Sequence, residues 1–388
     1  MKRRTAWEIK MKKLFYYTTK DMTDSEVGIN NKIREQIDFF RKSGFSVDAV
    51  YRRNVTELVV NRKNRTQERE DVLKTLRMRP YKIFANTLVR KYIEKNEYDC
   101  AYIRYVYCDM EFMKLLKALR KRCRCIVIEI PTFPYDAELV DNTEHRILLQ
   151  LDRLHRNGMK KYADRVVTFS PDSEIFGIPA IRTMNGLNFD HVGISERNDN
   201  YRDKINLIAV ASHARWHGYD RILAGMADYC KKGGERDFLF HIVGEGPELD
   251  NYRQMVQDNK LQDHVIFYGT RKGEELDEIY NNCDIAAASF GFHRIGLTLA
   301  SNLKSREYAA KGLPVISGVD IDIFKGPLSE YFCLVPYDDS PVDMEEVASF
   351  YDRIYGDKSH ESVSKTIRSI ASSECSLDAV MQPVLDVF

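Results

Sequence analysis

Three loops in the second half of the sequence combine cations, glycines and a carboxylate in patterns suited to a phosphorylated ligand. The first is the segment HARWHGYDR at 213–221, which follows an apolar run and precedes an amphipathic stretch. A helix that begins there offers free N–H groups and a partial positive charge, both of which favour phosphate. Arg215 adds a guanidinium fork and His217 a titratable donor. We predict phosphate binding here; a polar surface cluster at a helix start is the alternative.

The second loop is VGEGPE at 243–248, between a predicted strand and a predicted helix. Its glycines let the backbone turn sharply, but the spacing matches neither GxGxxG nor a Walker loop. Pro247 also suits the first position of a helix, so a simple tight turn is the alternative. We expect this loop to contribute to a ligand site only in company with the first.

The third loop opens the segment SNLKSREYAAKGLPVI at 301–316, and His293 and Arg294 lie just before it. Lys304 is predicted in the first turn of a short helix that ends at Gly312, and Glu307 falls on the same face three residues on. A cation suits phosphate, and a carboxylate accepts two hydrogen bonds from the vicinal hydroxyls of a ribose. The pair predicts a nucleotide site; an exposed ion pair between the two side chains is the alternative.

These loops must be positioned by strands, because short apolar runs alternate with helix-length segments along nearly the whole chain. We predict a helix from about 26 to 42 that ends at Gly44, and a joint between two domains at 188–203. The pattern predicts α/β architecture with two doubly wound parallel sheets, whose ligands bind at the carboxyl ends of strands and in a cleft where the domains face each other. The predicted strands are 14–18, 45–51, 100–104, 125–129, 166–169 and 180–184, then 205–211, 238–243, 265–268, 285–288, 315–317 and 333–335.

One loop of the first half also carries candidate catalytic side chains. The segment EIPTFPYD at 129–136 follows a predicted strand, and two prolines stiffen it. Glu129 or Asp136 is suited to orienting the hydroxyl of an acceptor molecule. The alternative is a structural Glu129 followed by a proline turn.

Charge is distributed unevenly between the two halves. Residues 1–130 carry 31 Lys and Arg against 17 Asp and Glu, and the rest of the chain carries 28 against 41. A basic half suits an anionic membrane face or a phosphorylated substrate.

The segment 62–95 mixes cations with apolar residues at helical spacing. We therefore expect two helices there, separated at Pro80, that either lie on an anionic bilayer or present a solvated face. No zinc-finger or RNP-like aromatic motif is present, which argues against nucleic acid.

The remaining composition points to a cytoplasmic protein. The eight cysteines are scattered without zinc-binding spacing, as in reduced cytosolic proteins. No apolar run approaches the length of a membrane span, and the basic N-terminus has no signal-peptide core. Residues 1–10 are expected to be an appendage, because Met11 also makes a natural start. We therefore expect a cytoplasmic location, which includes peripheral attachment at the inner face of the cell membrane.

Taken together, these segments resemble the GT-B glycosyltransferases, and among them family 4, the retaining "glycosyl transferases group 1" of bacterial polysaccharide biosynthesis. The resemblance implies two Rossmann-like domains facing across a cleft: 1–190 for the acceptor and 191–388 for the nucleotide-sugar donor, with the last helix able to pack back on the first domain. It rests on Gly28 and on segments that fall in the family's order: NGLN at 185–188, WHGYDRIL, IVGEGPEL, VIFYGT with EELDEIYNNCDIAAAS, and LKSREYAAKGLPVIS.

The resemblance also implies roles for individual residues. Glu307 matches the second acid of the family's E-x7-E motif, which binds the donor ribose, whereas Leu299 stands in place of the first acid. His217 occupies the place of the Lys that usually precedes Gly. The donor-binding candidates are Gly28, Arg215, His217, Gly218, Gly244, Glu245, Arg294, Lys304 and Glu307, and the catalytic candidates are Glu129, Asp136 and His293.

The function implied is transfer of a sugar from a nucleoside diphosphate donor to a saccharide or lipid-linked saccharide. We expect no cofactor and no metal, since no DxD motif stands at a suitable strand end and Asp320-Ile-Asp322 lies elsewhere. Retention of configuration follows from the resemblance alone. Two alternatives stay open: a catalytically silent GT-B-like subunit that binds glycan or a partner, suggested by Leu299, and a nucleotide-sugar epimerase of the same fold.

Overall fold

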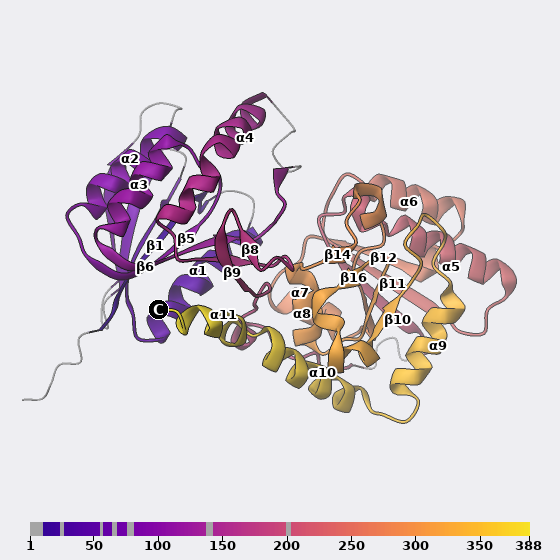
Figure 1. Cartoon of the computed structure of the whole chain (residues 1–388). Helices are drawn as coiled ribbons and strands as arrows, with labels where there is room; N and C mark the ends of the chain where they lie inside the picture. Colours follow the sequence, from indigo (N-terminus) through magenta and orange to yellow (C-terminus); the bar gives the residue numbers. More distant parts are fainter. Residues whose placement is uncertain are drawn as a thin grey trace, which may run out of the picture. The chain divides into compact units, whose positions relative to one another are not determined.

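The computed structural model describes residues 11–23, 27–54, 57–63, 68–75, 81–136, 143–198 and 203–388. The chain divides into two compact units, one of residues 1–184 with 381–388 and one of residues 185–380 (Figure 1). Each unit is built on its own sheet. No helix among these residues is long and apolar enough to cross a membrane.

The first unit contains a nine-stranded sheet whose six central strands are parallel. The strand order is β4-β3-β2-β1-β5-β6-β7-β9-β8, and β3, β4 and β8 pair antiparallel. Every strand predicted in this half is present within a few residues. The strands are β1 (Lys13–Asp21), β2 (Ser46–Arg52), β3 (Glu57–Lys63), β4 (Glu68–Thr75), β5 (Tyr98–Arg104), β6 (Cys123–Ile130), β7 (Arg165–Thr168), β8 (Glu174–Ile175) and β9 (Ile178–Arg182).

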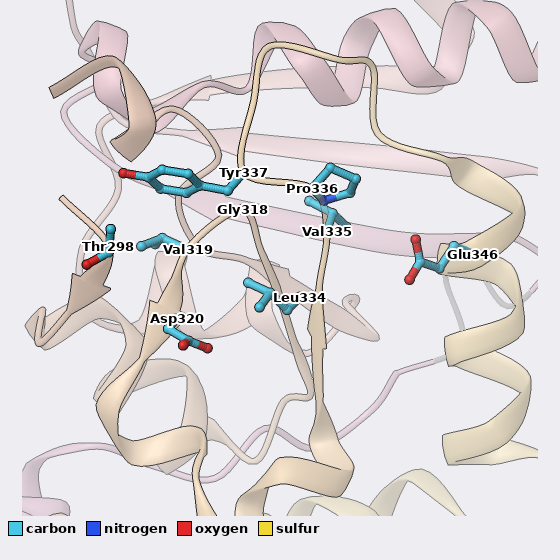
Figure 2. Close-up of a pocket in the computed structure, with 9 residues that line it drawn as sticks. All are labelled: Thr298, Gly318, Val319, Asp320, Leu334, Val335, Pro336, Tyr337 and Glu346. Atoms are coloured by element: carbon cyan, nitrogen blue, oxygen red, sulfur yellow. The ribbon is translucent and has the colours of Figure 1, made fainter. Parts of the chain in front are cut away.

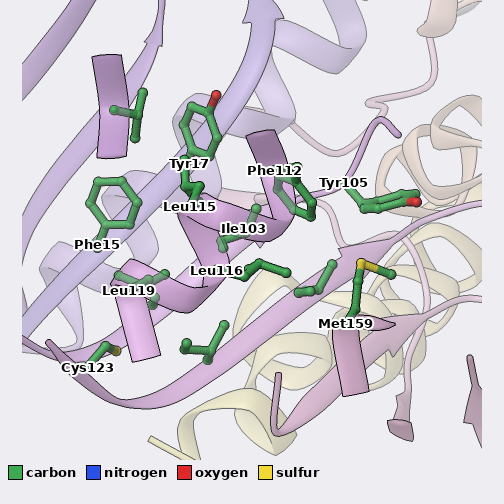
Figure 3. Close-up of a cluster of buried hydrophobic side chains, with 14 of the residues drawn as sticks. Phe15, Tyr17, Ile103, Tyr105, Phe112, Leu115, Leu116, Leu119, Cys123 and Met159 are labelled. Carbon is green, nitrogen blue, oxygen red and sulfur yellow. The ribbon is translucent and has the colours of Figure 1, made fainter. Parts of the chain in front are cut away.

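In the described part of this unit, four α-helices connect these strands. They are α1 (Val27–Lys42), α2 (Tyr81–Ile93), α3 (Met110–Arg120) and α4 (Thr143–His155), and the 3₁₀ turn η2 (Arg156–Lys161) follows α4. As predicted, the chain turns out of α1 at Gly44, where φ is +90°. The apolar face of α3 packs on β1, β5 and β6 in one buried cluster (Figure 3). Burial of these side chains from water is the main stabilisation of the unit.

The prediction of two helices over 62–95 is wrong for its first part. Residues 57–63 and 68–75 form the antiparallel pair β3–β4 instead, and only α2 is helical; Pro80 lies outside the described residues. Three consecutive apolar residues of β3, 58–60, are fully buried, as in a strand covered on both faces. Arg62 reaches Asp48 on one neighbouring strand and Asp71 on the other. Cross-strand charge pairing therefore replaces the expected helical stripe.

The second unit contains a six-stranded parallel sheet of order β12-β11-β10-β13-β15-β17 and a separate parallel pair, β14–β16. All six main strands were predicted, whereas the short pair was not. The strands are β10 (Ile205–Val210), β11 (Phe238–Val243), β12 (Val265–Gly269), β13 (Ile285–Ala287), β14 (Leu299–Ala300), β15 (Val315–Ser317), β16 (Asp320–Ile321) and β17 (Phe332–Leu334).

Helices of this half pack around the sheet (Figure 1). The chain returns to the first unit within the last helix, α11, and there the ring of Phe388 contacts those of Phe40 and Phe45. The helices are α5 (Asp220–Lys232), α6 (Leu249–Asp258), α7 (Glu274–Tyr280), α8 (Leu303–Lys311), α9 (Met344–Tyr355), α10 (His360–Cys375) and α11 (Leu377–Leu385).

Candidate functional site

Glycines bring the loops after β10, β11 and β13 into direct backbone contact. Gly218 has φ +66°, and a Cβ there would lie 2.5 Å from the amide nitrogen of Gly291. Gly244 has φ +118°, and its Cβ would lie 2.0 Å from the carbonyl oxygen of Ala211. Neither space nor backbone conformation tolerates a side chain at these positions. The first two predicted ligand loops and the loop after β13 therefore form one continuous backbone surface at the carboxyl end of the sheet.

The histidines of the first loop are buried and neutral. The ring of His217 stacks on Tyr219 with centroids 5.8 Å apart, and its Nδ1 accepts a hydrogen bond from the Ala214 amide at 2.9 Å. Burial, with a smaller effect of nearby Lys304, lowers the pKa of His217 to about 3. His213 is fully buried, and burial lowers its pKa to about 4. Since Nδ1 of His217 is an acceptor, Nε2 carries the proton and is the ring's one donor.

Lys304 is a partly buried cation with no carboxylate partner among the described residues. It lies in the first turn of α8, where the Asn302 side chain accepts a hydrogen bond from the amide of Ser305 at 3.0 Å. Its Nζ donates to the Ala288 carbonyl at 2.5 Å and to the Tyr219 hydroxyl at 3.3 Å. No carboxylate of the described residues pairs with it, and burial lowers its pKa to about 7. A cation in this state beside free helix N–H groups favours an anionic ligand.

Glu307 lies one turn further along α8. Its carboxylate accepts a weak hydrogen bond from the Tyr280 hydroxyl at 3.5 Å, and burial raises its pKa. Lys311, at the end of the same helix, pairs instead with Asp277 at 2.6 Å. The alternative of an exposed Lys304–Glu307 ion pair is wrong, because Lys304 is directed to the Ala288 carbonyl. Both side chains keep bonding capacity for a ligand.

Arg294 and His293 are engaged within the protein. Arg294 donates to both carboxylate oxygens of Asp220, at 3.1 and 2.7 Å, and to Asp339 at 2.7 Å. These hydrogen bonds raise its pKa further above the ordinary value of arginine. Nε2 of His293 lies 2.9 Å from the same Asp339 oxygen. Arg294 thus ties the turn η6 (Phe292–Ile295) to the start of α5, and both residues tie it to Asp339. Diphosphate contact by Arg294 and catalysis by His293 stay predictions.

Three predicted positions of this unit have exposed side chains. Arg215 is exposed, and its guanidinium forms no hydrogen bond or ion pair within the described part of the chain. Glu245 is exposed in the loop after β11. Leu299, which replaces the first acid of the motif, is 42% exposed in β14. These side chains are available to a ligand at the edge of the loops.

A pocket of about 520 Å³ opens beside these loops, at the carboxyl ends of β15 and β17 (Figure 2). The Tyr337 hydroxyl donates to the Leu297 carbonyl at 2.8 Å, and its ring contacts that of His293. Sequence reasoning missed Tyr337 and Asp339, which follow the short strand β17 without a motif. The pocket is lined by Thr298, Gly318, Val319, Asp320, Leu334, Val335, Pro336, Tyr337 and Glu346, none of them a predicted site residue.

In the first unit, Glu129 is fully buried and all its bonding capacity is used. One oxygen accepts from Arg104 at 2.6 Å and Lys32 at 3.3 Å, and the other from Tyr102 at 2.9 Å and Gln36 at 3.0 Å. Burial alone would raise the pKa of Glu129, but the two cations and the hydrogen bonds lower it to about 2. This is the geometry of the structural alternative, and a role in orienting an acceptor stays a prediction.

Asp136 belongs to a separate network. Its carboxylate accepts from Arg156 at 2.8 Å and from Arg153 at 2.7 Å, and the Arg156 bond lowers its pKa. Buried Asp152 on α4 accepts from the Tyr135 hydroxyl at 2.6 Å and so holds the loop 131–136 against the helix. Glu129 and Asp136 share no bonding partner among the described residues. Gly28 is exposed in the first turn of α1.

Within the described ranges, no three His, Cys, Asp or Glu side chains gather as a metal-binding group.

The sequence and the structure were compared with those of known proteins. Residues 194–325 match the family described as Glycosyl transferases group 1. No protein of a curated set matches the sequence. A glycosyltransferase from Rickettsia africae has a similar structure at 12% identity and a TM-score of 0.65, with 97% of this chain and 98% of that one covered.

Two further solved structures share this fold over nearly all of the chain. Sucrose-phosphate synthase from Thermosynechococcus elongatus is 17% identical, with a TM-score of 0.62 and coverage of 97% and 98%. HepE of Anabaena, in complex with UDP, is 13% identical, with a TM-score of 0.60 and coverage of 97% and 99%. The predicted GT-B fold of two α/β domains is confirmed.

Proposed function

We propose that this GT-B glycosyltransferase, whose second unit carries the group 1 region, transfers a sugar from a nucleoside diphosphate donor to a saccharide. The observation that carries the proposal is the Lys304 ammonium, which lies at the start of α8 with no carboxylate partner in the described part of the chain. A bound diphosphate would supply the missing negative charge. Glu307, one turn along the helix, would accept hydrogen bonds from the ribose. The UDP bound by HepE, which shares the fold, is consistent with this class of donor.

The other loop residues extend the donor site. Gly218 and Gly244 keep side chains away from the backbone surface on which the diphosphate would lie. Nε2 of His217 and the exposed guanidinium of Arg215 would add donors from the first loop. As the sugar–phosphate bond breaks, negative charge builds on the leaving diphosphate, and fixed cations with helix N–H groups stabilise that charge in the transition state. These protein charges support a metal-independent reaction.

The acceptor is proposed to bind the first unit. The excess of Lys and Arg over Asp and Glu in residues 1–130 suits an acceptor that bears phosphate, such as a lipid-linked saccharide. Asp136 lies on the proline-stiffened loop beside α4. Retention of configuration, a role in surface polysaccharide synthesis and action at the inner membrane face rest on the family resemblance and on the basic charge of this unit.

The test is thermal melting with UDP, GDP, ADP, dTDP and CMP and with their sugar conjugates, in the presence of EDTA. A ligand at a hundred times its dissociation constant adds about 2.7 kcal/mol to the free energy of unfolding. We expect one nucleotide to raise the melting temperature, and Glu307→Ala to reduce that shift. Glu361→Ala, an exposed carboxylate of α10, is the matched control and should leave the shift unchanged.

Other outcomes would redirect the proposal. A melting shift that appears only with added Mg²⁺ would contradict metal independence. Turnover of the nucleotide sugar without any saccharide product would indicate an epimerase. Saccharide binding with no nucleotide shift would indicate a glycan-binding subunit and would overturn the donor site.

A further inference from the structure

Helix α4 turns an apolar face outward. Ile147 is 58% exposed, Leu151 38% and Leu154 76%. With 3.6 residues per turn, these three positions lie on one side of the helix. The opposite side is buried and includes Leu149 and the carboxylate of Asp152. An ordinary surface helix buries its apolar face, whereas α4 exposes an apolar face to solvent.

The surroundings of α4 extend this apolar surface. Asp152 accepts hydrogen bonds from the Cys108 amide at 2.8 Å and from the Tyr105 hydroxyl, so the helix packs on the loop after β5. That loop and the start of α3 carry two more exposed apolar side chains, Val106 at 47% and Met110 at 59%. An apolar surface of this kind has a free-energy cost in water and indicates an interaction site.

The charges around α4 define the partner. Between 143 and 161 the chain has five Lys and Arg residues and two acids, Glu144 at the start of α4 and the buried Asp152. Arg153 and Arg156 pair with Asp136, whereas Lys160 and Lys161, at the end of the turn η2 that follows α4, are exposed. An isologous contact with a second copy would bring these cations together, since such an interface pairs a surface with itself. The apolar stripe with basic flanks is instead complementary to an anionic lipid surface.

We propose that the α4 face, formed by Ile147, Leu151 and Leu154, docks on an anionic lipid bilayer, with the flanking basic residues contacting the headgroups. The inference rests on the proposed function, because a docked α4 face would bring the enzyme to the bilayer in which a lipid-linked acceptor is anchored. The buried side of α4 holds the loop 131–136 through the Tyr135–Asp152 hydrogen bond. Docking of the helix would therefore present this candidate acceptor loop to a substrate anchored in the same bilayer.

The test is flotation of the full chain with vesicles of phosphatidylcholine, with or without phosphatidylglycerol. We expect binding to the anionic vesicles, and a loss of at least about tenfold in the triple variant Ile147→Gln, Leu151→Gln, Leu154→Gln. The control Val72→Gln with Leu334→Gln removes two exposed apolar side chains elsewhere and should bind as the unmodified chain does.

A second pair of variants tests the charges. Lys160→Glu with Lys161→Glu should weaken binding to anionic vesicles more than Lys117→Glu with Lys121→Glu, which changes the net charge equally on exposed sites of α3 and its end. Equal binding by the triple variant and the unmodified chain would overturn the proposal. So would the absence of vesicle binding together with a dimer that Leu154→Gln dissociates, because the face would then join two copies.

The experiments distinguish a failure of the donor-site proposal from a failure of the membrane-docking proposal. The proposed nucleotide contacts Lys304 and Glu307 lie in the second unit, so the nucleotide-induced melting shift should be unchanged in the α4 triple variant. Its absence from the unmodified chain would overturn the donor site and leave the vesicle result standing.

Discussion

The charged side chains near the carboxyl ends of the two sheets differ in whether an opposite charge compensates them. In the first unit, Glu129 has two cations and two neutral donors, and Asp136 has two arginines. In the second unit, Lys304 and Glu307 are partly buried, and no opposite charge of the described residues is in contact with them. A compensated network stabilises its own geometry, whereas an uncompensated one has electrostatic energy to gain from a ligand. The difference separates scaffold from binding site more clearly than residue type does.

The largest effect should come from breaking the compensated network. Glu129→Ala leaves Lys32 and Arg104 as neighbouring buried cations, so the free energy of unfolding should fall by about 3–5 kcal/mol in urea denaturation. Glu97→Ala, which removes an exposed ion pair with Arg122, should cost less than about 1 kcal/mol. A small loss of stability with complete loss of sugar transfer would contradict the scaffold role and make Glu129 a catalytic residue.

A contrasting result is expected at the uncompensated cation. Lys304→Met should weaken nucleoside diphosphate binding by about 1–3 kcal/mol in titration calorimetry, because a charged hydrogen bond to phosphate is lost. The same change should raise the free energy of unfolding without nucleotide, since it removes a shielded charge that has no partner.

Lys311 provides the matched control on the same helix. Its ammonium is buried and paired with Asp277, so Lys311→Met should destabilise the chain and leave the nucleotide contacts in place. If both variants shift stability in the same direction, the contrast between compensated and uncompensated charge does not hold for α8.

The pH dependence of the free energy of unfolding should show a smaller effect of Lys304. Burial lowers the pKa of Lys304 from 10.5 to about 7. Below about pH 7 the side chain is protonated in both the folded and unfolded chain. Between about 7 and 10.5 the unfolded chain binds more protons, so the contribution of Lys304 to stability rises with pH. Lys304→Met should flatten this part of the stability profile.

Donor binding should couple to the same proton. A diphosphate favours the charged ammonium, so binding at pH 8 should take up as much as about one proton per site. Titration calorimetry in two buffers of different ionisation enthalpy measures that number. Equal heats in both buffers would show that Lys304 is already charged, or that it does not contact the ligand.

The smallest effect is expected at the half-exposed network of the first unit. Asp136→Asn weakens ion pairs to Arg153 and Arg156 that solvent already screens, so the free energy of unfolding should fall by less than about 1 kcal/mol. Urea denaturation in parallel with Glu129→Ala makes the comparison direct. A loss as large as that of Glu129→Ala would mean that Asp136, and not Glu129, organises this edge of the sheet.

The fold was predictable from the sequence because the parallel strands are nearly continuous apolar runs, which buried sheets require. The exception was 62–75, where charged side chains with several apolar residues fit a helical stripe as well as they fit β3 and β4. Only the partners Asp48 and Asp71 decide between the two, and they lie on neighbouring strands. The spacing of apolar residues within one segment does not reveal contacts with other strands.

The candidate site was predictable in part for a similar reason. The placement of Lys304 and Glu307 follows from local capping and helical spacing, so the sequence predicts both. The engagement of Arg294 depends on Asp220 and Asp339, which are far away along the chain. The outward face of α4 was missed because helical spacing reveals an apolar stripe without showing which side packs on the sheet.

The contact between Gly218 and Gly291 also bears on how new specificities are engineered into this chain. Because the backbones of two loops touch with no room for a Cβ, grafting either loop alone from a relative would open or crush the surface they share. The two loops must be transplanted as one block, together with the turn at Gly244. The exposed side chains of Arg215, Glu245 and Leu299 can be varied singly, so a library aimed at a different donor sugar belongs at those three positions.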